Sequence, residues 1–131
     1  MMDKKPILTR FNDYDYYGHL SSAAAVHLSI QERLNDFCEE IKLCEKDEIK
    51  FIAKKISIDF KKECKIFLDI FKKIEIKNIS PFSFNIMYVF FSSENEVFFE
   101  VDTKMCFISK ESKLVGMPKY FLDKVQDFRK F

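Results

Sequence analysis

Two aspartates, a glycine and a histidine lie close together near the start of the chain. Asp13, Asp15, Gly18 and His19 fall within the stretch RFNDYDYYGHLSSA, which spans residues 10–23. An aspartate carboxylate can act as a base or a nucleophile on a carbonyl group. The N–H groups at the start of a helix can stabilise the oxyanion that then forms. The stretch is therefore a candidate site for acyl-group chemistry, provided that a helix begins directly after it.

The two aspartates also have a plainer interpretation, because aspartate before a glycine commonly forms a turn. On an extended strand Asp13 and Asp15 would point the same way, and their repulsion would raise the pKa of one of them. A metal site formed with His19 is disfavoured, because hard cations prefer more oxygen ligands than this segment offers. His19 is interpreted as a structural donor in the turn, and His27 as a packed or half-exposed helix residue.

A helical pattern follows the stretch directly. Apolar residues recur at steps of three and four, a period near 3.6 that predicts one long helix. These residues are Ala23, Val26, Ile30, Leu34, Phe37, Ile41 and Cys44. The hydroxyl of Ser21 or Ser22 would accept a free N–H of the first turn. The helix would run for roughly 20 residues, or about 30 Å.

The pattern changes to alternation in the rest of the chain. Apolar residues occupy every second position in four stretches, which are 52–60, 64–77, 82–90 and 97–107. The first stretch is interrupted at Lys54. Alternation predicts strands with one apolar face, and the short joints between them predict antiparallel pairing. Pro118 begins a predicted short helix over 118–128. The expected architecture is a single α+β domain over residues 1–131, with a curved sheet wrapped around the central helix.

The other face of the predicted sheet also carries phenylalanine. These residues are Phe67, Phe71, Phe91 and Phe98. Apolar side chains on a face that would otherwise meet water indicate a partner surface. The sequence therefore predicts a homodimer or a homotetramer.

Composition argues against several other functions. The chain has 2 Gly in 131 residues, too few for the glycine-rich loops that bind nucleotides. Its 22 Lys and Arg balance 21 Asp and Glu, which does not suggest a nucleic-acid partner. The four cysteines form no Cys-x-x-Cys pair, and no Gly-x-Ser-x-Gly esterase motif is present. No apolar run is long enough for a signal peptide or a membrane span, so a cytoplasmic protein with reduced thiols is expected.

The pattern Asp13-x-Asp15-x-x-Gly18-His19-Leu20, followed by a helix and then by strands, resembles a known family. It is similar to the hotdog-fold acyl-CoA thioesterases of the hydroxybenzoyl-CoA thioesterase-like family, which usually read Asp-x-Asp-x-x-Gly-His-Val-Asn-Asn here. The resemblance implies the hotdog fold. It also implies hydrolysis of acyl-CoA or acyl carrier protein thioesters, without a metal or a cofactor, at sites built between two subunits.

The resemblance also implies roles for individual residues. Asp15 matches the catalytic carboxylate of the family. The residues expected to form the oxyanion region are Tyr16, Tyr17, Gly18, His19, Ser21 and Ser22. The residues expected to support the site or to line its groove are Asp13, Arg33, Asn78 and Ser80.

The chain departs from the family pattern on the helix. Ser21 and Ser22 replace the two asparagines, Ala25 and Leu28 stand where aromatic residues are usual, and Ile30 replaces a glutamate. The smaller side chains would alter the acyl pocket. Two alternatives therefore stay open: a non-catalytic hotdog module that binds acyl thioesters or a protein partner, and a hotdog dehydratase that acts on acyl thioesters.

Overall fold

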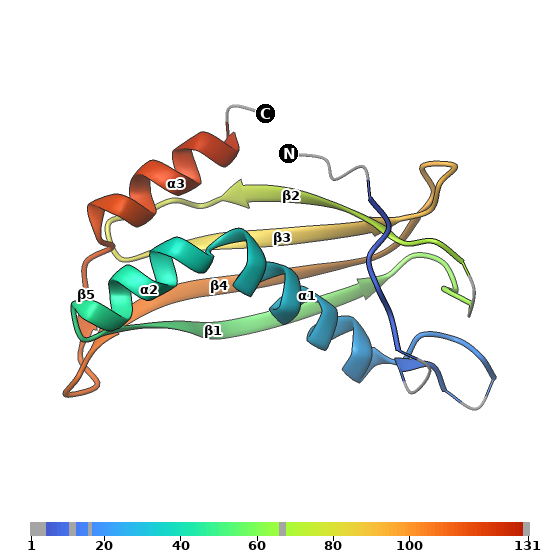
Figure 1. Ribbon diagram of the computed structural model, residues 1–131, viewed down its shortest axis with the longest axis horizontal. Helices are drawn as coiled ribbons and strands as arrows, with labels where there is room; N and C mark the ends of the chain where they lie inside the picture. Colours follow the sequence, from blue (N-terminus) through green and yellow to red (C-terminus); the bar gives the residue numbers. More distant parts are fainter. Residues whose placement is uncertain (1–4, 11–12, 16, 66–67, 130–131) are drawn as a thin grey trace.

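The computed structural model describes residues 5–10, 13–15, 17–65 and 68–129, and it combines helices with a single sheet. The elements in chain order are α1 (Ser22–Asp36), α2 (Cys38–Lys46), β1 (Ile49–Phe60), β2 (Phe71–Lys77), β3 (Ser83–Phe91), β4 (Val97–Ser109), β5 (Leu114–Val115) and α3 (Lys119–Arg129). The strand order is β1-β4-β3-β2, with β5 paired to β4, and every pair is antiparallel (Figure 1). The predicted α+β class and antiparallel sheet are confirmed.

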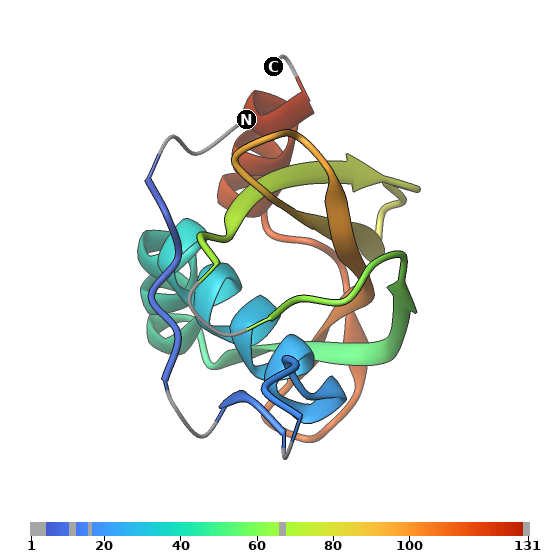
Figure 2. The same cartoon turned by 90° about the vertical axis from the view of Figure 1, so that its right-hand side faces the viewer.

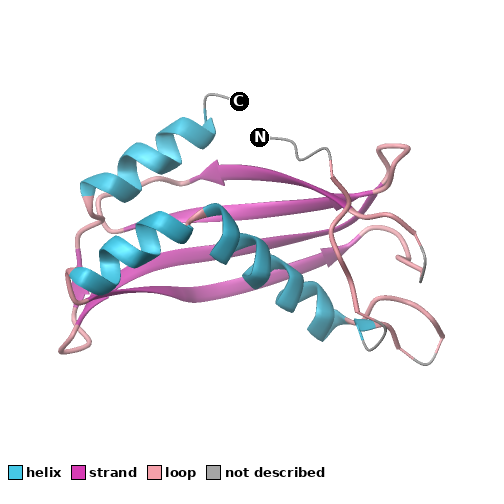
Figure 3. Ribbon diagram, viewed as in Figure 1, coloured by secondary structure: helices cyan, strands magenta, loops and turns pink. Residues whose placement is uncertain are grey.

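The sheet curves around the helices. Seen end-on, it bends from β2 through β3 and β4 to β1, with α1 and α2 on its inner side (Figure 2). Figure 3 shows that α3 packs near the end of the sheet that α2 also approaches. A sheet with one apolar face must cover that face, and here the helices cover it.

Phenylalanine rings form the middle of the core. The ring of Phe37 lies 5.9 Å from that of Phe51 in β1 and 5.7 Å from that of Phe121 in α3. Phe84 and Phe107 of the sheet also contact this cluster. Ring pairs at such separations stabilise a core beyond the burial of their area. The short C-terminal helix, predicted over 118–128, therefore completes the core.

The single long helix that the periodicity predicts is in fact two helices. α1 ends at Asp36 and α2 begins at Cys38, and Phe37 between them has φ −117° and ψ 22°. Residues 22–46 contain neither Gly nor Pro, so no local signal marks the break. Tertiary contacts explain it, because Phe37 is fully buried among rings and Asp36 is bonded to side chains of the sheet.

The predicted apolar stripe of the helix is also wrong in α1. Ala23 and Leu34 are exposed, and Val26 and Ile30 are half-buried. The buried residues of α1 are Ala24, Ala25, Leu28, Ser29 and Glu32. The predicted stripe and the face that is actually buried both recur with the periodicity of a helix. The face with small residues packs on the sheet because it can approach closely, and because its charged residue finds a buried partner.

The predicted strand over 64–77 begins later than expected, since β2 starts at Phe71. Ile66 and Phe67 lie outside the described residues. The carbonyl of Cys64 accepts a hydrogen bond from the N–H of Leu20 at 2.7 Å. The first part of the predicted strand is therefore attached to the segment that precedes α1, and not to the sheet.

The phenylalanines expected on the outer face are mostly buried. Phe91 and Phe98 are 8% and 2% exposed, and Phe71 is half-buried. In the pairing of β3 with β4, Phe90 faces Phe99 and Phe91 faces Val97, so Phe98 has no partner. This bulge interrupts the alternation and turns Phe98 into the core beside Phe99. The outer face is consequently less apolar than the sequence predicts.

A similar bulge lies at Lys54, where the pairing of β1 with β4 passes from Ala53 directly to Lys55. It accounts for the interruption in the first alternating stretch.

Among the described residues, no helix has the length and apolarity that crossing a membrane requires.

Candidate active site

The segment before α1 forms a closed turn around Asp15. Oδ1 of Asp15 accepts hydrogen bonds from the backbone N–H groups of Tyr17 at 2.9 Å and His19 at 3.0 Å. The backbone N–H of Asp15 donates to the His19 carbonyl at 2.7 Å. Gly18 has φ 75°, in the left-handed region that glycine enters without steric cost. The turn therefore fixes one oxygen of the exposed carboxylate, and Oδ2 has no hydrogen-bond partner among the described residues.

Asp13 has a different environment from Asp15. It is 3% exposed, and its carboxylate accepts hydrogen bonds from the backbone N–H of Arg10 at 2.7 Å and from its guanidinium at 2.9 Å. Burial by itself would raise the pKa of Asp13, but these hydrogen bonds and the charge of Arg10 outweigh it and lower the pKa. The predicted repulsion between Asp13 and Asp15 therefore does not determine the pKa of Asp13, which is lowered and not raised. Its carbonyl also accepts the N–H of Ser21 at 3.0 Å, so Asp13 anchors the turn to the helix.

The start of α1 offers free N–H groups beside this turn. The hydroxyl of Ser21 accepts the N–H of Ala24 at 3.1 Å, which confirms the predicted serine cap. Within the described part of the chain, the N–H groups of Ser22 and Ala23 have no hydrogen-bond acceptor. Both residues are exposed, and the helix dipole adds partial positive charge at this end. The two N–H groups can therefore stabilise an oxyanion.

His19 connects the turn to residues 63–65. Its backbone forms a bridge with Lys65, and its Nε2 lies 3.4 Å from a carboxylate oxygen of Glu63. Its backbone N–H donates to Asp15, a hydrogen bond that does not involve the imidazole ring. Tyr17 is exposed at the tip of the turn, and Tyr16 lies outside the described residues.

Two of the predicted groove residues lie at the far end of the sheet. Asn78 and Ser80 follow β2, whereas α1 begins at the opposite end (Figure 1). Asn78 is exposed with φ 55°, and the hydroxyl of Ser80 accepts the N–H of Ser83 at 3.1 Å. Both residues shape the turn between β2 and β3, and the fold of one chain does not bring them to Asp15.

Arg33 lies in the last turn of α1 and lines a cavity of about 640 Å³ between the helices and β1. It is 12 residues beyond the cap Ser21, which corresponds to roughly 18 Å along the helix. One chain therefore also holds Arg33 away from the Asp15 turn. The described residues contain no group of three side chains that could hold a metal ion.

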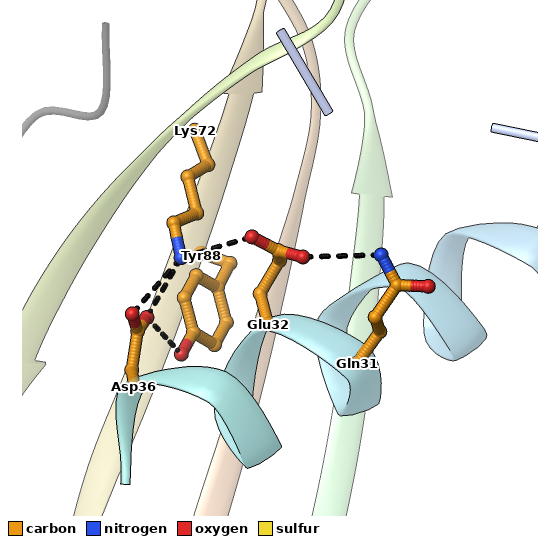
Figure 4. A network of polar contacts seen from close by, with 5 residues as sticks. All are labelled: Gln31, Glu32, Asp36, Lys72 and Tyr88. Carbon is orange, nitrogen blue, oxygen red and sulfur yellow. Dashed lines mark hydrogen bonds and ion pairs between the residues drawn. The ribbon is translucent and has the colours of Figure 1, made fainter. Parts of the chain in front are cut away.

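A buried ionic network under the C-terminal half of α1 was not predicted from the sequence (Figure 4). Nζ of Lys72 on β2 lies 2.9 Å from Glu32 and 3.0 Å from both carboxylate oxygens of Asp36. The hydroxyl of Tyr88 on β3 donates to Asp36 at 2.7 Å. Gln31 donates to the other oxygen of Glu32 at 3.2 Å. The network connects α1 to β2 and β3.

Burial by itself would lower the pKa of Lys72, but the hydrogen bond with Glu32 and the charge of Asp36 raise it. A signal for this network is present in the sequence, since Lys72 shares the inward face of β2 with Ile74 and Ile76. A lysine at such a position requires a buried counter-charge. The identity of that counter-charge depends on the packing of the helix.

Comparison with known proteins places most of the chain in one family. The family model described as the thioesterase-like superfamily matches residues 9–125. A comparison with curated proteins finds no match.

Solved structures share the fold at low sequence identity. A probable thioesterase from Escherichia coli has a TM-score of 0.82 and 15% identity, over 95% of this chain and 96% of that chain. A 1,4-dihydroxy-2-naphthoyl-CoA thioesterase from Synechocystis has a TM-score of 0.82 and 15% identity, over 92% of this chain and 93% of that chain. A DHNA-CoA thioesterase from Staphylococcus aureus has a TM-score of 0.80 and 18% identity, over 96% and 87%. The predicted hotdog fold and the thioesterase class are thus confirmed, and the chain belongs to the thioesterase-like superfamily.

Proposed function

We propose that this protein hydrolyses acyl-CoA thioesters at the turn before α1, with Asp15 as base or nucleophile. The observation that carries the proposal is the state of the Asp15 carboxylate. Oδ1 is held by two backbone N–H groups, while Oδ2 of this exposed residue has no partner among the described residues. A carboxylate oriented through one oxygen keeps the other available for reaction.

The chemistry needs a base and an oxyanion site, and the turn and the helix start supply both. With Asp15 as base, a water molecule adds to the thioester carbonyl carbon as its proton passes to Oδ2. The N–H groups of Ser22 and Ala23 stabilise the oxyanion. Its collapse breaks the C–S bond, and the proton moves to the leaving thiolate, so that a free acid and a thiol result. With Asp15 as nucleophile, Oδ2 attacks the same carbon, the thiolate leaves, and water opens the resulting anhydride.

Coenzyme A is the favoured carrier of the acyl group, because two of the structural neighbours are named as thioesterases of an acyl-CoA. Acyl carrier protein is the alternative carrier, and its acyl thioesters are to be assayed beside the acyl-CoAs in the test below. The four cysteines are free thiols, which fits a cytoplasmic protein.

The assembly that fits this chain is a homodimer across β1. This strand of 12 residues is hydrogen-bonded on one side to β4 and forms an edge of the sheet. Residues 53–57 in its middle are all exposed. A long free edge is a template for pairing with a second strand, and a two-fold axis satisfies both edges at once. A strict monomer in light scattering at micromolar concentration would contradict the dimer, and the same measurement separates a dimer from a tetramer.

Thiol release from acyl-CoAs of increasing chain length, with Asp15→Asn beside the wild type, tests the proposed function. Asparagine keeps an acceptor for the two N–H groups that hold the turn, but it cannot take a proton. We expect a loss of about 10²–10⁴ in turnover. Asp69→Asn is the matched control, since Asp69 is also an exposed aspartate. Unchanged turnover in Asp15→Asn would remove Asp15 from the mechanism, and tight acyl-CoA binding without any thiol release would favour the non-catalytic module.

A further inference from the structure

A cavity lies between the helices and β1, on the open side of the edge strand. Its volume is about 640 Å³, a size typical of sites for small molecules. The apolar side chains that line it are Leu34, Ile41, Ile49, Phe51 and Ile52. Leu34 is 53% exposed, although it belongs to the stripe that the sequence predicts to be buried. This part of α1 and α2 therefore presents apolar surface to the cavity.

Arg33 is a cation inside this apolar lining. Burial lowers the pKa of its guanidinium, which is a sign that the charge is poorly solvated. Among the described residues, no carboxylate forms an ion pair with Arg33, and its side chain makes no hydrogen bond. A partly buried guanidinium of this kind is a ready donor of paired hydrogen bonds to a carboxylate.

The other charged residues of the cavity lie at its rim. Glu48 and Lys110 face each other at 4.0 Å, and both side chains are about 70% exposed (69% and 70%). Glu45 and Lys50 are exposed as well. Counted with Arg33, the three cations and two anions of the lining leave a surplus of one positive charge. The interior of the cavity is thus apolar, with one cation that has no internal counter-charge.

We propose that this cavity binds the acyl group of thioester substrates that end in a second carboxylate, and that Arg33 binds that carboxylate. The inference rests on the proposed function and names its substrate class as dicarboxylic acyl thioesters. The apolar lining accepts the methylene chain, and the guanidinium forms two charge-assisted hydrogen bonds with the distal carboxylate. An uncharged acyl group of the same length leaves the arginine without a partner.

The proposed dimer brings this cavity to the reacting end of a second subunit. Antiparallel pairing of two β1 strands about their midpoint places Ile49 of one subunit beside Phe60 of the other. The segment after Phe60 reaches Cys64, whose carbonyl binds the N–H of Leu20 at 2.7 Å, close to the Asp15 turn. The cavity of one subunit therefore adjoins the Asp15 turn of the other. Arg33 acts here as a specificity-determining residue across the interface.

Adipoyl-CoA and hexanoyl-CoA test this substrate class, because their chains have equal length and only the first ends in a carboxylate. We expect the wild type to hydrolyse adipoyl-CoA with a kcat/KM at least tenfold higher. Arg33→Met should lower kcat/KM for adipoyl-CoA by about 10- to 100-fold, the usual effect of losing a charged hydrogen bond. The value for hexanoyl-CoA should change less than threefold. Lys42→Met, which removes an exposed cation of α2 that does not line the cavity, is the matched control and should keep the adipoyl preference.

Calorimetric titration with free adipate and free hexanoate provides a readout that does not depend on catalysis. Adipate should bind the wild type and not Arg33→Met, and this result supports the inference even if neither thioester is hydrolysed, an outcome that would refute only the proposed function. Hydrolysis of both thioesters by the wild type at equal rates would overturn the inference. So would equal losses for both in Arg33→Met, or a loss of the dimer in Arg33→Met by light scattering, which would make Arg33 an interface residue.

Discussion

Lys72→Met tests whether the buried network holds α1 on the sheet. The side chains of Lys72 and Glu32 are each 8% exposed, so the variant leaves buried carboxylates without their cation. Removing one partner of a buried ion pair costs about 3–5 kcal/mol. An unfolding entropy of about 2.1 cal/mol/K per residue gives roughly 0.28 kcal/mol/K for a chain of this length. The melting temperature should therefore fall by roughly 10–20 °C.

Urea unfolding followed by far-UV circular dichroism measures this loss. Lys73→Met is the matched control on the same strand, because Lys73 is 45% exposed and pairs with Glu75 at 3.3 Å. An exposed pair of this kind contributes about 0–1 kcal/mol. Adding Glu32→Gln to Lys72→Met should recover part of the stability, since one unpaired charge disappears. Equal losses of under about 1 kcal/mol in Lys72→Met and Lys73→Met would refute the network as a stabilising feature.

The pH dependence of the unfolding free energy is a second readout of the same variant. The pKa of Lys72 is raised above its ordinary value of 10.5 in the folded protein. Its contribution to stability is therefore fully present below that value, and it is lost as the pH rises through the raised folded pKa. The alkaline loss of stability that comes from this lysine should be missing in Lys72→Met.

Three further outcomes follow from the turn, the helix cap and the thiols. Ser21→Ala should cost about 1 kcal/mol of unfolding free energy through loss of the cap, and Ser22→Ala much less, in paired urea titrations. The fold lowers the pKa of Asp13, so its carboxylate stabilises the folded protein fully above the unfolded pKa of 3.8. This stabilisation is lost as the pH falls through the folded pKa. Asp13→Asn should therefore make the unfolding free energy less dependent on pH in the acid range. Exposed Cys38 should react rapidly with a thiol reagent. Burial raises the pKa of the Cys64 thiol to about 11, so this cysteine should react only on unfolding. A rapidly reacting thiol that persists in Cys38→Ser would contradict this expectation.

Much of the fold was predictable because it depends on local patterns. The alternation of β3 and β4, the serine cap and the C-terminal helix each follow from residues close together in the sequence. The glycine of the candidate site was predictable for the same reason, since Gly18 has the positive φ that a closed turn requires. The predictions that were wrong concern positions where a distant residue decides the outcome.

The break of the helix at Phe37 is one example, because the rings that surround it come from β1, β3 and α3. The outer face of the sheet is another. The alternation in the sequence places Phe98 on the outer face, but a bulge in the pairing of β4 with β3 turns its side chain into the core. A bulge depends on the register between two strands, and one strand alone does not reveal it.

The sequence by itself determined β3, β4, the C-terminal helix and the turn that carries Asp15, because alternation, turn and cap chemistry act within a few residues. Only the tertiary structure decided which face of α1 is buried and which charges accompany it. Glu32 lies inside because Lys72 arrives from a strand 40 positions later. A buried charge is tolerated only beside an opposite one, and the fold alone brings the two together. For the same reason Arg33, which meets no carboxylate among the described residues, became a candidate for binding one from the substrate.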